Sequence, residues 1–307
     1  MAIEIIRHKD DAAWKAYRAQ GIGSSEVGTI LGVNKWQTPY ALWLQKTGQA
    51  PATPQNIAMR VGHELEAFVA QLYEEKTGNI VDKATEGNWS VRNDIRPYTI
   101  ASPDRICVSK ADGHKILLEC KTTQTAVDYD NIPPYWFCQV QYLLACSGME
   151  DGAIAWLVGN HDFGTKRIVR DENFQQWMFE RLDKFWLDNI QGGIPPQPVN
   201  ASDVESMFPH PVEGKAVEAD AVVAKTISEL REKQAIYSAL KKEIDGLKAN
   251  VRTFMTDANS LLVDGKVAAV LSEYTSSRID VERLKMERPD VYEAYCKTSA
   301  TTTLRVK

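Results

Sequence analysis

At the centre of the predicted sheet lies the sequence Ile116-Leu117-Leu118-Glu119-Cys120-Lys121. Its first three residues are apolar, which is typical of a buried central strand. Successive side chains of a strand point to opposite faces, so Glu119 and Lys121 share one face and Cys120 lies on the other. A carboxylate and an ammonium at the end of a buried strand are costly unless other groups compensate them. The sequence therefore predicts a polar site at one end of this strand.

Further strands and helices are predicted around this strand. Residues 98–101 and 106–108 have a strand pattern before it, and 153–158 with 165–169 have the pattern of a hairpin after it. Apolar residues at helical spacing predict helices at 11–20, 24–31, 38–48, 60–77, 133–147 and 172–189. We therefore expect an α/β fold in which helices flank a β-sheet.

The chain has 307 residues, which suits one large domain or two modest ones. A Gly- and Pro-rich stretch at 192–198 is the best linker candidate, so we expect a first domain over 1–192 and a C-terminal extension over 193–307. In order, the extension is expected to hold a linker at 192–214, one long helix at about 216–257, a hairpin and a short helix within 258–307, and a last strand near 302–306. The long helix has an apolar seam that would pair with a second subunit or fold back on the first domain.

Composition excludes several classes of protein. No apolar run reaches the ~18 residues that a membrane-spanning helix needs, and we expect no membrane partner. The five cysteines form no C-x-x-C pair, which argues against a disulfide framework or a zinc site. They lie within predicted core elements rather than in a terminal cluster, which argues against an iron–sulfur nuclease. The first residues lack the pattern of a secretory signal, so we expect the cytoplasm. The net charge is −5, so DNA binding would need local basic patches and metal ions.

Asp104 lies in the turn between two predicted strands, from which it can approach Glu119. Two carboxylates and the backbone carbonyl of Cys120 form an oxygen set suited to Mg²⁺ or Mn²⁺. Such an ion can polarise a phosphodiester and acidify a bound water, which Lys121 can orient. The same residues would also suit a surface Asp and a solvated ion pair at a strand end.

Two predicted helices add polar residues to this set. In the helix at 60–77, Glu66 follows a core-facing leucine, so it can reach a neighbouring metal site, although the helix dipole alone also favours a Glu there. In the helix at 133–147, Gln139 and Gln141 stand in an otherwise apolar run. They need partners if they are buried, which the edge of an active site would supply, and none if they face solvent.

The order of these motifs resembles that of a known family. In chain order the motifs are G-x-x-x-E from Gly62 to Glu66, Ser102-Pro103-Asp104, E-x-K from Glu119 to Lys121, and Gln139-Val140-Gln141-Tyr142. They resemble the YqaJ-type viral recombinase family, the phage-lambda-type exonucleases of the PD-(D/E)xK superfamily. The resemblance begins at 14–18 and 21–27 and extends to about residue 190. It implies a restriction-endonuclease-like core with a mixed β-sheet flanked by helices.

The resemblance also implies a role for each matching residue. At the catalytic centre it places Asp104, Glu119, Glu66 and the backbone carbonyl of Cys120 as metal ligands, Lys121 as the catalytic lysine, and Gln139 beside them. Arg18 and Ser25 match positions that hold the 5′-phosphate end of the DNA. A serine near a helix N-terminus with a guanidinium nearby is a reasonable anion site, although Arg18 also suits an exposed position on its helix.

The activity implied is that of a Mg²⁺-dependent exonuclease of phage or prophage recombination, which degrades one strand of linear duplex DNA 5′→3′ from 5′-phosphorylated ends. Two ions, with Mn²⁺ as a substitute, a ring-shaped homotrimer around DNA and a single-strand annealing partner are implied as well. Two alternatives stay open: an endonuclease or restriction-type relative on the same core, and a DNA-binding assembly module with a decayed nuclease centre. The complete set of Asp104, Glu119 and Lys121 argues against the second.

Overall fold

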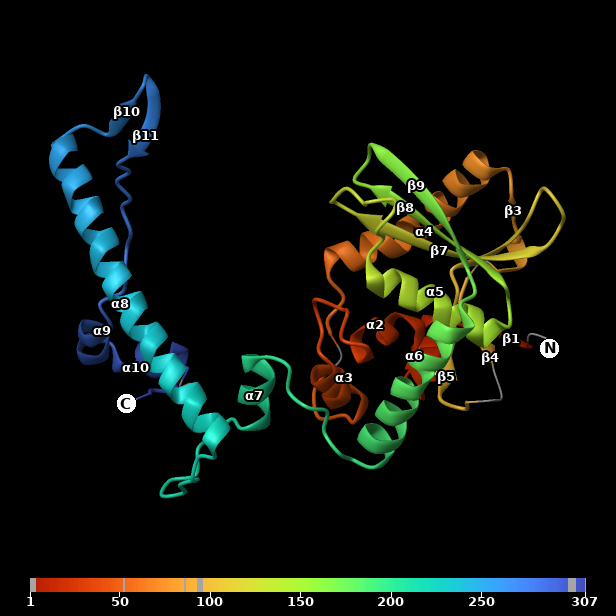
Figure 1. Cartoon of the computed structure of the whole chain (residues 1–307), viewed down its shortest axis with the longest axis horizontal. Coiled ribbons are helices and arrows are strands. Elements are labelled where there is room, and N and C mark those ends of the chain that lie inside the picture. The colour runs from red at the N-terminus through yellow and green to blue at the C-terminus, as the bar shows by residue number, and fades with distance from the viewer. Residues whose placement is uncertain (1–3, 52, 86, 93–95, 298–301, 307) are drawn as a thin grey trace. The chain divides into compact units, whose positions relative to one another are not determined.

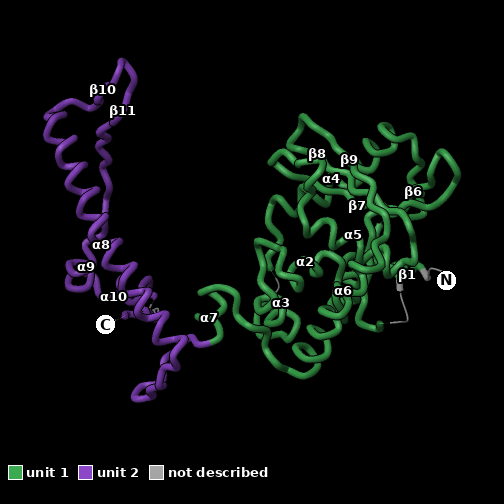
Figure 2. The backbone as a smooth tube through the Cα atoms, in the orientation of Figure 1, with its two compact units in different colours: residues 1–207 green, residues 208–307 purple. Residues whose placement is uncertain are grey.

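The computed structural model describes residues 4–51, 53–85, 87–92, 96–297 and 302–306 (Figure 1). The chain forms two units, Met1–Met207 and Phe208–Lys307 (Figure 2). The division lies beyond the predicted boundary at 192/193 because helix α7 (Ala201–Met207) packs with the first unit. Asp203 of α7 is buried and accepts a hydrogen bond of 2.7 Å from the Thr38 hydroxyl, and Met207 packs against the main core.

The first unit is built on a five-stranded sheet with the order β3-β6-β7-β8-β9. Its strands are β3 (Ile80–Val81), β6 (Arg105–Val108), β7 (Lys115–Thr123), β8 (Asp151–Val158) and β9 (Asp162–Val169). β7 and β8 are parallel and the other neighbours are antiparallel, so the sheet is mixed. Helix α5 (Pro134–Ser147) connects the parallel pair, as such a crossover requires.

Different helices cover the two faces of this sheet. Helix α4 (Ile57–Thr77) packs on one face and α5 on the other (Figure 1). The alternate residues of β7 from Ile116 to Cys120 lie in the core against α4, whereas Leu117 lies in the core against α5. Glu119 and Lys121 follow Leu117 on the α5 side. The predicted alternation along this strand is therefore confirmed.

Smaller elements complete the first unit. β1 pairs with β4 antiparallel, and β2 pairs with β5 parallel. In chain order these elements are β1 (Glu4–Arg7), α1 (Asp11–Arg18), β2 (Ile22–Gly23), the 3₁₀ turn η1 (Ser24–Glu26), α2 (Val27–Ile30), α3 (Pro39–Lys46), the 3₁₀ turn η2 (Lys83–Thr85), β4 (Trp89–Arg92), β5 (Thr99–Ile100), α6 (Glu172–Lys184) and the π-helical segment η3 (Phe185–Gln191) that continues α6. The predicted helices are all present, and α4 begins earlier than predicted because Asn56 caps it.

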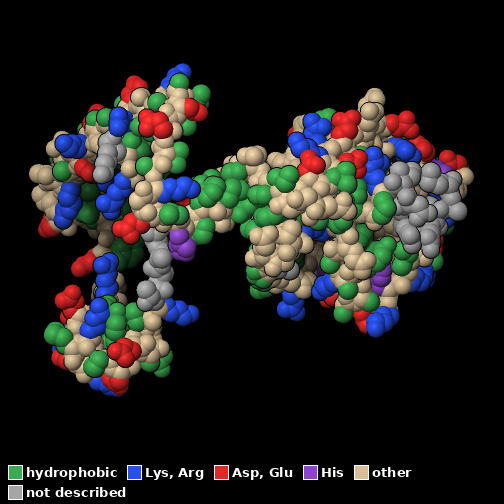
Figure 3. Space-filling view, turned by 90° about the horizontal axis from the view of Figure 1, so that it is seen from below, with side chains coloured by type: hydrophobic (Ala, Val, Ile, Leu, Met, Phe, Trp, Pro, Cys, Tyr) green, Lys and Arg blue, Asp and Glu red, His purple; other side chains and the backbone are tan. Residues whose placement is uncertain are grey.

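The surface carries both signs of charge. On the face shown in Figure 3, Lys and Arg side chains are interspersed with Asp and Glu side chains over each unit. This distribution agrees with the slightly negative net charge. Among the described residues, no helix combines the length and the apolar character that crossing a membrane requires.

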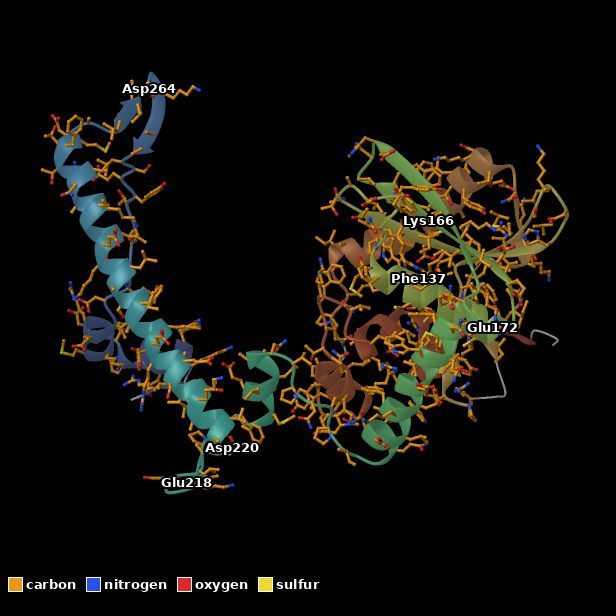
Figure 4. The ribbon with its side chains drawn as sticks, in the orientation of Figure 1. Phe137, Lys166, Glu172, Glu218, Asp220 and Asp264 are labelled. Atoms are coloured by element: carbon orange, nitrogen blue, oxygen red, sulfur yellow. The ribbon has the colours of Figure 1, made fainter. Side chains whose placement is uncertain are left out.

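The second unit is dominated by helix α8 (Ala221–Met255), followed by a hairpin and two short helices. These elements are β10 (Ser260–Val263), β11 (Lys266–Val270), α9 (Val281–Glu287) and α10 (Pro289–Tyr295). α8 begins later than the predicted residue 216 because Asp220 caps it and accepts a hydrogen bond from the Val223 N–H (Figure 4). The predicted hairpin is confirmed, with Asp264 at a positive φ in its turn. The strand predicted near 302–306 is wrong, since these residues are irregular.

Candidate active site

Three polar side chains meet at the end of β7. Lys121 Nζ lies 2.7 Å from Glu119 Oε1 and 2.8 Å from Gln139 Oε1, and donates to both. The Gln139 amide nitrogen donates to the same Glu119 oxygen at 2.5 Å. Glu119 is only 2% exposed, so these bonds compensate for the burial of its charge. The ion pair predicted as a possible surface feature is therefore an inward-facing network.

Asp104 joins this network from the neighbouring strand. It immediately precedes Arg105, which pairs with Leu118 across β6 and β7, so the carboxyl of Asp104 comes close to Glu119. Its Oδ2 accepts a 2.7 Å hydrogen bond from the backbone N–H of Cys120. The backbone of Cys120 therefore contacts Asp104 through its N–H group. The role of its carbonyl as a metal ligand stays a prediction.

Glu66 of α4 approaches the same centre from the other side. It lines a pocket of about 330 Å³ together with Asp104, Ser102 and Trp14. His63, one turn earlier on α4, lies 3.4 Å from Glu66 Oε1 through its Nδ1. The structure therefore brings Glu66 together with Asp104, as predicted from its position beside the apolar face of the helix.

Burial and mutual repulsion perturb these carboxyl groups. Burial, reinforced by the charge of Asp104, raises the pKa of Glu119 to about 8 and that of Glu66 to about 7. The pKa of Asp104 is also raised by burial, although Lys121 opposes the rise. Burial alone would lower the pKa of Lys121, but the carboxylates of Glu119 and Asp104 outweigh it and the pKa is raised. The site holds more acidic groups than one ammonium can balance.

The donor set fits a hard divalent cation. Glu119 Oε2 is buried and has no hydrogen-bond partner, so one carboxylate oxygen is left free for a ligand. Carboxylate oxygens from Asp104, Glu119 and Glu66 are the ligands that Mg²⁺ and Mn²⁺ prefer. No group of three or more His, Cys, Asp or Glu among the described residues is already arranged around a common ion position. Asp104 and Glu119 are instead engaged by protein donors.

Arg18 and Ser25 are brought together beside this centre. Arg18, at the end of α1, donates a 2.9 Å hydrogen bond to the Ser25 hydroxyl, and its Cζ lies 4.7 Å from the centroid of the Trp14 ring. The neighbouring Ser24 lies 3.5 Å from the amide nitrogen of Gln139. Ser25 is exposed and Arg18 is half-buried. The two residues predicted to hold a phosphate therefore lie together. Ser24, which precedes Ser25, contacts Gln139 at the acidic cluster, which comprises Asp104, Glu119 and Glu66.

Ser24 and Tyr142 are contacts that the sequence analysis did not assign to the site. The Tyr142 hydroxyl is buried, donates to the Ile22 carbonyl at 2.6 Å and accepts from the Ile100 N–H at 3.0 Å. It thereby holds β2, which Ser24 follows directly, together with β5, which Asp104 follows four residues later. The signal was present, because Tyr142 follows Gln139 by three residues on the same helix.

Gln141 does not belong to this site. It is buried as its apolar surroundings suggest, but its side chain donates to the Val169 carbonyl and accepts from the Asp171 N–H. These partners lie at the junction of β9 and α6. Only Gln139 of the two glutamines therefore faces the acidic cluster, because residues two apart on a helix point in different directions.

Comparison with known proteins places this arrangement in a family. The profile of the YqaJ-like viral recombinase domain matches residues 13–150, which include Asp104, Glu119, Lys121 and Gln139. Over 291 residues the chain is 32% identical to the uncharacterized protein YqaJ of Bacillus subtilis (strain 168), covering 91% of this chain and 89% of that protein. The chain belongs to the YqaJ-like viral recombinase family. The resemblance predicted from the motifs is confirmed, and the similarity to YqaJ extends into the second unit.

Solved structures are similar to a part of this YqaJ-like chain. An alkaline exonuclease from Laribacter hongkongensis is 19% identical, with 59% of this chain and 92% of that chain covered and a TM-score of 0.47. A phage-related exonuclease from Haemophilus somnus 129PT is 14% identical, with 57% and 96% covered and a TM-score of 0.42.

Proposed function

We propose that this YqaJ-like protein is a Mg²⁺-dependent DNA exonuclease that hydrolyses one strand of linear duplex DNA. The observation that carries the proposal is the buried network of Glu119, Lys121 and Gln139 beside Asp104 at the end of β7. A solvated ion pair would need no buried amide bridge and would leave no carboxylate oxygen without a partner. Membership of a viral recombinase family supports DNA as the substrate.

The residues of the site divide the work between them. Asp104, Glu119 and Glu66 would hold two divalent ions, with Mn²⁺ able to replace Mg²⁺, and the backbone carbonyl of Cys120 would add a ligand. When bound, such ions polarise the phosphodiester and lower the pKa of a coordinated water. The Lys121 ammonium, oriented by Glu119 and Gln139, stabilises negative charge that develops on the phosphate.

Strand polarity follows in this proposal from Arg18 and Ser25. A guanidinium and a hydroxyl 2.9 Å apart can both donate to a terminal phosphate, which would place a 5′-phosphorylated end next to the cleavage site. The enzyme would then degrade that strand 5′→3′. A homo-oligomeric ring, proposed as a trimer, would need positive charge only around its channel, in keeping with the mixed charges in Figure 3. A single-strand annealing protein would act on the strand left behind.

The test is digestion of end-labelled DNA by the full chain with Mg²⁺ or with EDTA. The substrates are linear duplexes with 5′-phosphate or 5′-hydroxyl ends, labelled on one strand at either end, beside a closed circle. We expect loss of the 5′-phosphorylated linear strand from its 5′ end, only with Mg²⁺, and an intact circle. Cutting of the circle would favour an endonuclease, and binding without cleavage would favour a DNA-binding module with a decayed centre.

A further inference from the structure

Trp36 is an exposed aromatic residue held in a defined place. Its side chain is 74% exposed, so it adds little to the core of the protein. Its backbone N–H nevertheless donates to the Asn34 side chain at 3.0 Å, and Asn34 in turn donates to the Thr29 hydroxyl and to the Gly28 carbonyl. These bonds fix the backbone of the loop that follows α2, on which Trp36 lies.

Trp36 is paired with a second aromatic residue at the beginning of α5. The rings of Trp36 and Tyr135 have centroids 5.3 Å apart and meet edge to face at 87°. The pair depends on Gly28, because a Cβ at this position would lie 2.7 Å from the Cβ of Tyr135. The glycine lets α2 and α5 approach closely enough to bring the two rings together.

This aromatic pair lies next to the acidic cluster. Tyr135 precedes Gln139 by four residues on α5, so the two side chains occupy one face about 6 Å apart along the helix. On the facing segment, Gly28 is opposite Tyr135 and Ser24 is opposite Gln139. Burial raises the pKa of Tyr135, and the positive charge of Lys121 opposes the rise. The pair is therefore one helical turn from the network of Glu119, Lys121 and Gln139.

Arg18, the acidic cluster and the aromatic pair are joined through one short segment. Ser25, which Arg18 contacts, lies between Ser24, which is opposite Gln139, and Gly28, which is opposite Tyr135. A strand whose 5′ end rests at Arg18 and Ser25 therefore has the aromatic pair within reach of its first nucleotides. A flat, exposed ring at that point can stack on a base of any identity.

We infer that Trp36 and Tyr135 form a stacking site for an unpaired base near the 5′ end of the bound strand. The inference rests on the proposed nuclease function, because it takes the position of the strand end from the 5′-phosphate site. The site would hold a strand that is separated from its complement, without selecting a sequence. The exposed Lys35 next to Trp36 adds positive charge for the backbone of the same strand.

The test measures binding of a linear duplex that has a 5′-phosphate and four unpaired nucleotides at that end, in EDTA to prevent cleavage. Trp36→Ala should weaken binding about tenfold, and Trp36→Phe should restore most of it because a ring is kept. Trp177→Ala is the matched control, since this tryptophan is also exposed but lies on α6, and it should bind as the wild type does. Equal affinities of Trp36→Ala and wild type would overturn the inference.

Abasic positions locate the stacked base. Removing one base at a time from the unpaired end should weaken binding by the wild type at one position, and Trp36→Ala should bind that abasic DNA and intact DNA equally. A loss of affinity that is the same at every position would instead show an aromatic contact with something other than a base. A wild type that binds through Trp36 but cleaves no DNA with Mg²⁺ would disprove the nuclease function alone. Normal cleavage with no effect of Trp36→Ala on affinity would disprove the stacking site alone.

Discussion

At the scale of single residues, Lys121 is the side chain whose surroundings are best defined. Its ammonium has two protein partners, Glu119 and Gln139, and both lie on the α5 side of β7. Lys115, on the same strand, is exposed at the opposite end. A comparison of substitutions at the two lysines therefore distinguishes the effect of removing a positive charge from the effect of breaking this network.

Lys121→Ala should bind Mg²⁺ and DNA but lose cleavage by about 100-fold or more, because in the proposed reaction the ammonium stabilises charge that develops on the phosphate. Rates under single-turnover conditions and DNA affinity measured separately provide the test. Lys115→Ala should cleave at the wild-type rate. Unchanged cleavage by Lys121→Ala would remove this lysine from the reaction.

Glu66 predicts a dependence of stability on pH. Its pKa in the folded protein is about 7 against an ordinary value of 4.5, so folding favours the protonated form. Without metal, the free energy of unfolding should therefore fall as the pH rises from about 4.5 to about 7. Glu66→Gln should match the wild type at pH 4.5 and be more stable at pH 8 in EDTA. Thermal unfolding at both pH values tests this, and equal melting temperatures at pH 8 would contradict it.

Arg18→Ala should mainly remove the preference for 5′-phosphorylated over 5′-hydroxyl ends, since in the proposed function the guanidinium beside Ser25 binds the terminal phosphate. The measurement is the ratio of cleavage rates on the two kinds of end. Lys15→Ala is the control, because Lys15 lies on the same helix in an exposed pair with Asp11. A ratio that survives in Arg18→Ala would place the end-binding site elsewhere.

At the scale of elements, α5 organises the site. It covers one sheet face, supplies Gln139 to the acidic cluster and carries Tyr142, which ties β2 and β5 together. Tyr142→Phe removes both bonds and leaves the buried Ile100 N–H without this partner. The expected loss is about 1–3 kcal/mol of unfolding free energy in urea. Tyr129→Phe, in an exposed loop, should change it little, and an equal loss in both variants would contradict this role of Tyr142.

The sequence predicts these elements well where a pattern is local. Alternation along 116–121 gives the faces of Glu119 and Lys121, and the caps at Thr38 and Gly78 mark helix ends. Contacts that join distant segments have no local pattern. The bond from Tyr142 to Ile22 joins residues 120 positions apart, and no spacing in the sequence predicts it. The boundary predicted at 192/193 differs from the division at 207/208 for the same reason, because the bond between Thr38 and Asp203 spans 165 residues.

At the scale of the whole molecule, the two units differ in how many hydrophobic residues they bury. The first has two extensive cores, whereas Met255 is the only hydrophobic residue buried among the described part of the second. The first unit therefore has the interior that an independently folding domain needs.

Truncation tests where the first unit ends. The fragment 1–207 should unfold cooperatively and keep the nuclease activity of the full chain on linear DNA. The fragment 1–192 should melt at a lower temperature, because it lacks the buried Asp203 and its bond to Thr38, together with Met207. Thermal unfolding of both fragments decides this. Equal melting temperatures would move the end of the first unit back to residue 192.

The separate covering of the two sheet faces restricts how β7 can change in length. One amino acid inserted between Leu117 and Glu119 would shift the downstream half of the strand by one pleat. The carboxylate would then enter the apolar layer beneath α4, and the thiol of Cys120 would take the place of Lys121 beside Gln139. Insertions and deletions should therefore be rare in this segment among related chains. The turn at 111–113 should tolerate changes in length better, because it is exposed and lies outside both layers.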